Sequence, residues 1–472
     1  MDSNSVPLVV DLDGTLIRSD IFLESLLGLL SQDPLKAIHA IGGLRHGRAE
    51  LKGRLADSGI IEAERLPINT DVLEFLRAER ESGRRIYLAS ASDRRDAQSV
   101  AEHLQLFDGV FGSEEGINLS GSAKSRRLCE AFGEGGFDYI GDAKIDEAVW
   151  RMARRVYIAN ARKKHLTDVR AWAPEAKSIG LREVHIMEYI RTLRPHQWLK
   201  NLLIFVPPLA AHDFISLFGV SMLAFLSFCL CASSVYILND LLDLRNDRAH
   251  SRKRTRPFAA GKIPVMHGVL LIPLLLTSSF GLALFLHAEF IGVLSIYYVV
   301  TCAYSFFLKK KMLIDVIALA CLYGCRIWAG AAATQLVLSP WLIAFAIFIF
   351  LCLALVKRCS ELIDHIQGEK GEPRGRGYRL ADLPALQSMA AASGYISILV
   401  LALYFNSPAV LILYSHPDRL WIICVILLFW ISRTLLLTHR GEMHDDPVVF
   451  ATLDRTSLIA ALACLGTVIV SL

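Results

Sequence analysis

Hydrophobic and polar positions divide the chain into two parts of different character. In the first 160 residues, short apolar runs at positions 6–10, 85–90 and 137–140 are separated by charged, helix-like stretches. Short, continuously apolar runs of this kind are typical of strands buried in a parallel sheet. From position 193 onward, long apolar runs follow one another with few charges inside them. The pattern predicts an α/β domain followed by an all-α membrane domain.

The apolar runs of the second part form about nine candidate membrane spans, each close to the ~20 residues that a helix needs to cross a bilayer. Lys and Arg gather in the loops after the second, fourth, sixth and eighth spans, and loops rich in these residues stay on the cytoplasmic side. The sequence therefore predicts a multi-pass protein of the inner (cytoplasmic) membrane, with its first domain in the cytoplasm. The spans are residues 198–214, 214–238, 264–287, 290–308, 313–334, 339–356, 383–404, 420–438 and 457–472.

Domain boundaries follow the same division. The α/β domain is expected over residues 1–160, with a helical insertion at about 17–76, and the membrane domain over 193–472. A basic linker with an amphipathic segment, residues 161–192, joins them. A net charge of +4 gives no global support for nucleic-acid binding. The 10 cysteines form no Cys-x-x-Cys pair and lie mostly in apolar runs, which argues against a disulfide framework or a zinc site.

Residues suited to phosphoryl transfer accompany the predicted strands. The carboxyl ends of parallel strands meet at one edge of a sheet, where open α/β sheets place their sites. Phosphoryl transfer needs a nucleophile, a cation that neutralises charge, and donors to the phosphoryl oxygens. The residues that supply these parts are, in chain order, Asp11, Asp13, Ser90, Lys124, Asp142 and Asp146.

Together, Asp-x-Asp-Gly-Thr, the strand-end Ser, the Lys and Gly-Asp-x-x-x-Asp resemble the four motifs of haloacid-dehalogenase-like (HAD) phosphatases, which have a Rossmann-like fold. The resemblance implies that Asp11 is the nucleophile that forms an aspartyl-phosphate and that Asp13 is the general acid and base. The helical insertion is similar to the cap that such enzymes close over their substrate. A degenerate, non-catalytic HAD domain is the alternative. The resemblance further implies phosphoryl contacts from Ser90 and Lys124, and Mg²⁺ held by Asp11, the Asp13 carbonyl and Asp142, with Asp146 in support.

A cluster of carboxylates ends the second apolar run. On one continuous helix, Asp240, Asp243 and Asp247 would be spaced i, i+3 and i+7 and would share a face. Carboxylates at the end of a membrane helix are costly unless they are paired or bind metal, and Mg²⁺ often binds carboxylates together with substrate phosphates. A solvated helix end is the alternative. Basic residues follow the carboxylates directly, and this order favours the binding of a metal-bound polyphosphate. They are Arg245, Arg248, Arg252, Lys253, Arg254 and Arg256.

The motif Asn239-Asp240-x-x-Asp243-x-x-x-Asp247 resembles the first aspartate motif of the UbiA superfamily of membrane prenyltransferases, which binds Mg²⁺-diphosphate. Its basic continuation through Pro257 is similar to the branch that transfers phosphoribose to polyprenyl phosphate, the decaprenyl-phosphate phosphoribosyltransferases. The resemblance implies Asp240 and Asp243 as catalytic residues. It also implies metal contacts from Asn239, Asp240, Asp243 and Asp247, and substrate contacts from Arg248, Lys253, Arg254 and Arg256.

Other polar residues are expected on the same side of the membrane. Lys200 and Asn201 open the membrane domain and are candidates for phosphate contacts, with an interfacial anchor as the alternative. Where aromatic prenyltransferases carry a second aspartate motif, this chain has Lys357-Arg358-Cys-Ser-Glu361. A basic pair is better suited to a metal-free phosphate, although Lys357 and Glu361 also have the spacing of a simple helix ion pair.

These observations support one leading hypothesis and two alternatives. A bifunctional enzyme would transfer 5-phosphoribose from phosphoribosyl pyrophosphate (PRPP) to polyprenyl phosphate in the bilayer, and its HAD domain would then remove the 5-phosphate, with Mg²⁺ at both sites. In one alternative, the membrane domain uses prenyl diphosphate and an aromatic or lipid acceptor. In the other, the HAD domain is regulatory or acts on an unrelated substrate. Prenyl chain length and a homo-oligomeric state are left open.

Overall fold

The structure, a computed structural model, describes residues 6–472 apart from 115, 162, 182–185, 251, 369–370, 373–376 and 444–445. It divides into two units. The first comprises Met1–Leu193 with Tyr236–Ile272, and the second comprises Arg194–Val235 with Pro273–Leu472. Parts of the predicted linker, residues 162 and 182–185, lie outside the described residues.

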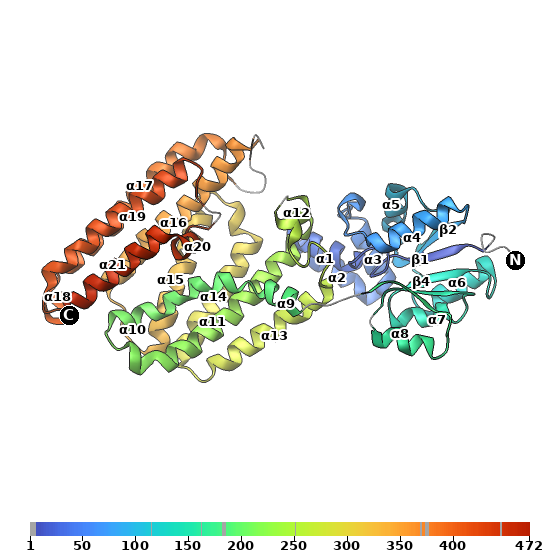
Figure 1. Ribbon diagram of the computed structural model, residues 1–472, viewed down its shortest axis with the longest axis horizontal. Helices are drawn as coiled ribbons and strands as arrows, with labels where there is room; N and C mark the ends of the chain where they lie inside the picture. The colour runs from blue at the N-terminus through green and yellow to red at the C-terminus, as the bar shows by residue number, and fades with distance from the viewer. Residues whose placement is uncertain are drawn as a thin grey trace. The chain divides into compact units, whose positions relative to one another are not determined.

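A six-stranded parallel sheet forms the centre of the first unit, with strand order β3-β2-β1-β4-β5-β6 (Figure 1). The prediction of an α/β domain with a parallel sheet is confirmed. The last strand pairs with β5, so the sheet extends beyond the predicted boundary at residue 160. The strands are β1 (Leu8–Asp11), β2 (Ile86–Asp93), β3 (Gly109–Ser113), β4 (Asp138–Gly141), β5 (Val156–Ala161) and β6 (Lys177–Leu181).

Alternation along β1 separates the two faces of this sheet. Leu8 and Val10 pack in the cluster that includes residues of α4 and α5, whereas Val9 packs in the cluster that includes residues of α6, α7 and α8. Helices on both faces bury the central strands β1 and β4 completely, which explains the continuous apolar character of their runs. The helices are α4 (Thr70–Glu81), α5 (Arg94–Leu104), α6 (Ser122–Phe132), α7 (Glu147–Trp150) and α8 (Lys163–Arg170).

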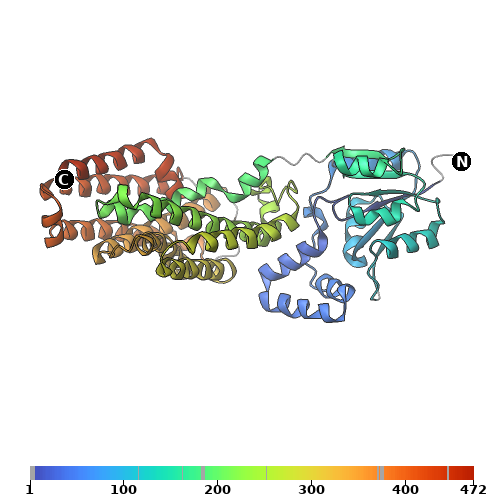
Figure 2. The same cartoon turned by 90° about the horizontal axis from the view of Figure 1, so that it is seen from below.

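The helical insertion forms a small lobe with its own apolar cluster, which includes Leu29, Ala37 and Leu51. Figure 2 shows these helices, drawn in blue, as a group beside the sheet. Asp20 begins the first of them by accepting a hydrogen bond from the Leu23 amide at 2.9 Å. The insertion comprises α1 (Ile21–Gln32), α2 (Pro34–Gly42) and α3 (Arg48–Ala56).

Long apolar helices make up most of the remaining chain. Among the described residues, seven helices are long and apolar enough to cross a membrane, or eight if the bent pair α20–α21 is one span, so the predicted count of nine is not confirmed. The first predicted span is one that the structure does not form as a single long helix. Its residues lie in a 3₁₀ segment (Pro195–Phe205) and the short α10 (Val206–Ala210). The other helices are α9 (Ile186–Leu193), α11 (Phe214–Leu242), α12 (Leu244–Ala249), α13 (Val265–Ala283), α14 (Ala288–Phe306), α15 (Ile314–Thr334), α16 (Pro340–Gln367), α17 (Leu383–Phe405), α18 (Pro408–Leu413), α19 (Trp421–His439), α20 (Pro447–Leu453) and α21 (Arg455–Ser471).

The second unit is held together by an apolar core to which α15, α16, α17 and α19 contribute. Tyr323 stacks on Phe350 with ring centroids 5.2 Å apart, and Leu353, Leu386 and Ile431 belong to the same buried cluster. Tight packing of this kind, rather than exclusion from water, is what associates apolar helices inside a bilayer. The all-α membrane prediction is confirmed.

Candidate active sites

Asp11 and Lys124 form a buried pair at the carboxyl edge of the sheet. Asp11 ends β1, and its Oδ1 accepts a hydrogen bond from Lys124 Nζ at 2.6 Å. Burial raises the pKa of Asp11, against the attraction of Lys124. Burial lowers the pKa of Lys124, but Asp11 and Asp146 raise it by more, so the ammonium stays charged. A positive charge fixed beside the carboxylate is suited to holding an anionic phosphoryl group.

Asp13 is fixed by donors on both of its oxygens. Oδ1 accepts from the Ile21 amide at 2.7 Å, and Oδ2 accepts from the hydroxyls of Ser92 at 2.8 Å and Ser90 at 3.2 Å. The Ile21 amide belongs to the first residue of the cap helix α1. Asp13 therefore connects the sheet edge to the first helix of the insertion.

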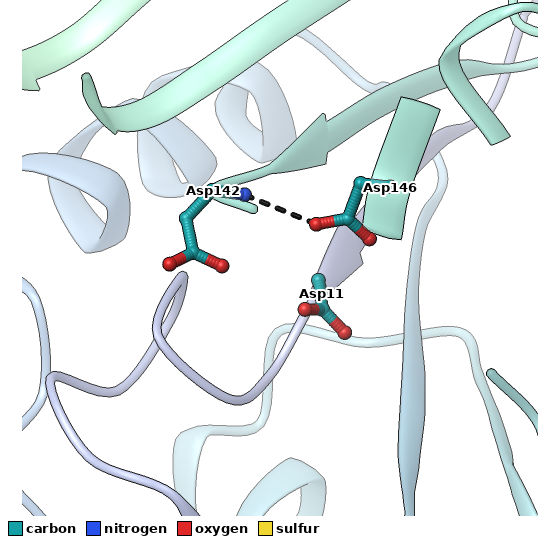
Figure 3. A group of neighbouring side chains, drawn as sticks. All are labelled: Asp11, Asp142 and Asp146. Carbon is teal, nitrogen blue, oxygen red and sulfur yellow. Dashed lines mark hydrogen bonds between the residues drawn. The ribbon is translucent and has the colours of Figure 1, made fainter. Parts of the chain in front are cut away.

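Three carboxylates converge at this edge in a way that could hold a cation. One oxygen from each of Asp11, Asp142 and Asp146 lies within 4.8 Å of the others (Figure 3). Asp146 is oriented by Tyr139, which donates to its Oδ1 at 2.9 Å, and by the Asp142 amide, which donates to its Oδ2 at 3.3 Å. Hard oxygen donors of this kind are the ligands that Mg²⁺ prefers. Ser92 and Tyr139 were missed by the sequence reasoning, although Ser92 is two residues beyond Ser90 and so on the same face of β2.

Gly14 permits the close approach of Asp142. Its φ is +78°, and a Cβ atom there would lie 2.5 Å from Asp142 Oδ2. We expect Gly14→Ala to displace the Asp142 carboxylate and to lower phosphatase kcat at least about tenfold, since strain of about 1–3 kcal/mol would fall on the cation site. Hydrolysis of p-nitrophenyl phosphate at increasing Mg²⁺ concentration measures this. Gly133→Ala, at φ +83° with no atom within 4 Å of the added Cβ, is the control for backbone strain alone.

The second carboxylate cluster is arranged around an arginine. Arg256 Nη1 lies 3.0 Å from Asp240 Oδ1 and 2.5 Å from Asp247 Oδ2. Asp243 lies between α11 and α12, so the predicted single helix is interrupted there, although its amide still bonds to the Asn239 carbonyl at 2.9 Å. Burial raises the pKa of Asp247 to about 6, against the attraction of Arg256. Within the described residues, a group of three carboxylates close enough to hold a metal forms at Asp11 and not here.

The basic residues after this cluster are placed differently from one another. The Arg248 side chain is 8% exposed and donates from Nη1 and Nη2 to the two oxygens of Glu24 on α1, at 2.7 and 2.6 Å. Lys253 and Arg254 are exposed in a short 3₁₀ turn. Of the predicted substrate contacts in this segment, Arg256 forms ion pairs with both Asp240 and Asp247, and Lys253 adds an electrostatic attraction to Asp247.

In the second unit, two lysines share one carboxylate. Lys200 is ion-paired with Asp446, and Lys357 Nζ lies 4.0 Å from the same Asp446 oxygen. Lys200 Nζ also lies 5.8 Å from the centroid of the Tyr323 ring. A buried lysine and a half-buried one beside the single carboxylate of Asp446 place positive charge among apolar helices, which is suited to a phosphate. Asp446 was not among the predicted site residues; the sequence Asp446-Pro447 marks a helix start, and Asp446 indeed caps α20.

Arg358 and Asn201 are engaged with protein groups. Arg358, 1% exposed, pairs with Asp315 at 2.6 Å and with Glu361, its neighbour on α16. Asn201 accepts from Arg326 Nε at 2.9 Å. Asp315 and Arg326, two charged residues of α15, are both buried, each with its own partner. The structure thus brings Lys357 to Lys200 and Asp446, and Arg358 to a separate ion pair.

The chain thus joins a parallel α/β domain to a helical membrane domain. The sequence-family model described as "UbiA prenyltransferase family" matches residues 204–459 of this chain. The chain belongs to this family.

Individual proteins resemble different parts of the chain. Protein y4nM of Sinorhizobium fredii, described as uncharacterized, is 38% identical and matches 96% of this chain and 88% of its own length. The decaprenyl-phosphate phosphoribosyltransferase of Mycolicibacterium smegmatis is 31% identical and matches 59% of this chain and 90% of its own length. A HAD family hydrolase from Salmonella enterica serovar Typhi is similar in structure, with a TM-score of 0.26 at 16% identity over 36% of this chain and 68% of that chain.

Proposed function

We propose that the protein transfers 5-phosphoribose from PRPP to a polyprenyl phosphate and then removes the 5-phosphate from the product. The transferase half is supported by membership of the UbiA family and by the relative named decaprenyl-phosphate phosphoribosyltransferase. The observation that carries the phosphatase half is the convergence of Asp11, Asp142 and Asp146 beside Lys124. The protein would act as a multi-pass enzyme of the inner membrane, with the phosphatase domain in the cytoplasm.

In the transfer step, an oxygen of the polyprenyl phosphate attacks C1 of the ribose and diphosphate leaves. Asn239, Asp240, Asp243 and Asp247 would hold Mg²⁺ once Arg256, which pairs with Asp240 and Asp247, turns to the donor diphosphate. In the second unit, the positive charge of Lys200 and Lys357 beside Asp446 is suited to a lipid phosphate. At both sites, Mg²⁺ would neutralise negative charge on phosphate oxygens. Positioning and charge neutralisation lower the barrier, and the protein needs no covalent nucleophile for this step.

In the phosphatase step, Asp11 attacks the phosphorus of the 5-phosphate and forms an aspartyl-phosphate. Asp13 donates a proton to the departing O5 of the ribose, and Lys124 and Ser90 hold the phosphoryl oxygens. Asp13 then takes a proton from the water that hydrolyses the aspartyl-phosphate, which releases inorganic phosphate. The final product is polyprenyl-phosphoryl-ribose. Because both domains are in one chain, the intermediate meets the phosphatase at a raised effective concentration.

The products made by the purified full chain test this proposal. Given PRPP and a short polyprenyl phosphate, the chain should yield polyprenyl-phosphoryl-ribose, inorganic diphosphate and inorganic phosphate, identified by mass spectrometry of the lipid and by phosphate assays. A parallel reaction contains prenyl diphosphate and an aromatic acceptor. Prenylation of that acceptor, with no ribose on the lipid, would favour the alternative prenyltransferase activity.

A further inference from the structure

The phosphatase cavity in the first unit has a wall from outside the sheet domain and its cap. The cavity has a volume of about 860 Å³, and Asp11, Asp13 and Lys124 line it. The same cavity is lined by Glu188 of α9 and by five residues of the segment 261–266, which leads into the apolar helix α13: Gly261, Lys262, Pro264, Val265 and Met266. We call residues 261–266 the α13 wall. Pockets of roughly 300–1,000 Å³ bury ligands of drug size, so this cavity exceeds what a phosphoryl group and one sugar require.

The α13 wall approaches the phosphatase domain closely. Gly261 has a φ of +65°, and a Cβ atom there would lie 2.7 Å from Arg18 Cβ. Lys262 Nζ lies 3.0 Å from Glu188 Oε1, an ion pair between the wall and α9. Only glycine leaves room for Arg18 at position 261. This close packing indicates that the wall is an integral part of the cavity.

A buried ion pair holds the segment that precedes the wall. Arg248 donates from both terminal nitrogens to Glu24 on cap helix α1, and its Nε donates to the Ala259 carbonyl at 3.0 Å. One guanidinium thus connects the cap with the chain three residues before Lys262. Both side chains of the pair are 8% exposed. A bidentate pair of this kind has a fixed geometry. It therefore fixes the position of the wall relative to the cap.

The wall combines one cation with apolar side chains. Lys262 is exposed, Val265 is buried and Met266 is 46% exposed, and the latter two begin a helix whose length and hydropathy suit a membrane span. A soluble sugar phosphate offers nothing for apolar residues to bind. A lipid-linked sugar phosphate has a second negative charge at its phosphodiester, followed by hydrocarbon, which matches a lysine followed by apolar residues.

We propose that the α13 wall is the specificity site of the phosphatase and selects lipid-linked phosphomonoesters. Lys262 contacts the phosphodiester of polyprenyl-phosphoryl-ribose 5-phosphate, and Val265 with Met266 contacts the first isoprenoid carbons. The inference rests on the proposed function for the identity of the substrate. It adds that the membrane-proximal segment is part of the phosphatase site and decides what the phosphatase accepts.

The selectivity of the full-length enzyme tests this proposal. Phosphate release is measured from ribose 5-phosphate and from polyprenyl-phosphoryl-ribose 5-phosphate with a short prenyl chain. Lys262→Ala should lower the selectivity for the lipid substrate, as a ratio of kcat/KM values, about tenfold through a higher KM, because a binding contact that is equal in ground and transition states affects KM alone. Met266→Gln should act in the same direction. Lys177→Ala, an exposed lysine on β6, is the matched control.

Each result has a distinct meaning. Equal kcat/KM losses on both substrates, or an unchanged selectivity in both variants, would overturn the specificity role of the wall even if the wild-type enzyme releases phosphate from the lipid. A wild-type enzyme that hydrolyses ribose 5-phosphate but not the lipid substrate would overturn the proposed phosphatase function together with it. Turnover of ribose 5-phosphate by the variants reports that the cavity is folded.

Discussion

Asp11→Asn is expected to stop the reaction sequence at polyprenyl-phosphoryl-ribose 5-phosphate. The substitution keeps the size of the side chain but removes the attacking carboxylate and the partner of Lys124, which lies 2.6 Å away. Phosphatase kcat should fall by about 10³-fold or more, because loss of a covalent nucleophile removes the whole two-step route. Mass spectrometry of the lipid formed from PRPP should show the mass of one additional phosphate.

Two controls separate this effect from damage to the fold. Diphosphate release from PRPP should continue in Asp11→Asn, since the transfer step does not use that carboxylate. Asp168→Asn changes an exposed aspartate on α8 of the same domain and should leave the dephosphorylated product unaltered. If Asp11→Asn still yielded polyprenyl-phosphoryl-ribose, the phosphatase domain would be regulatory or would act on another substrate.

The phosphatase-like site was largely predictable because its parts follow local rules. Asp11 ends a buried strand and Asp142 follows another, and the ends of parallel strands meet at one sheet edge. Their convergence follows from the topology once the strands are recognised. The contacts of Tyr139 and of the α13 wall did not follow, because they depend on side-chain direction and on a segment more than 100 residues away in sequence.

The membrane half was predictable in class but less so in detail. Hydropathy identifies apolar helices, yet it does not distinguish a span from a short broken segment. Residues 198–214 are apolar enough to be counted, but Pro207 and Pro208 lack amide donors, and the segment forms a 3₁₀ turn and the short α10. Such irregular backbone is tolerated at membrane depth only where protein surrounds it.

Partner choice inside the membrane domain was the least predictable feature. Lys357 and Arg358 are adjacent in sequence, yet Lys357 is close to Asp446 and Arg358 pairs with Asp315 on α15. Successive helix residues point in directions about 100° apart, so neighbours in sequence meet different helices. The sequence shows that both cations lie near the same end of α16. Helix packing decides which partner each of them meets.

Asp240→Asn is expected to abolish transfer of ribose to lipid while the phosphatase remains active. Asp240 is 3% exposed, and it shares Arg256 with Asp247. Neutralising it removes a hard ligand for a metal-bound diphosphate and leaves the charge of Arg256 less compensated. Even outer partners of metal sites cost about 10–100-fold when mutated, so transfer should fall by about 100-fold or more. Labelled ribose from PRPP, counted in the lipid extract, measures the loss.

Asp213→Asn, an exposed aspartate just before the start of the same long helix, is the matched control and should transfer ribose normally. Hydrolysis of ribose 5-phosphate by Asp240→Asn shows that the chain is folded. If that variant transferred ribose at the wild-type rate, the donor diphosphate would have to bind elsewhere. The two lysines near Asp446 would then be the next site to test, because both bring positive charge to one carboxylate. If Lys357→Ala lost ribose transfer while Asp240→Asn kept it, we would infer that those lysines bind the donor diphosphate rather than the lipid phosphate.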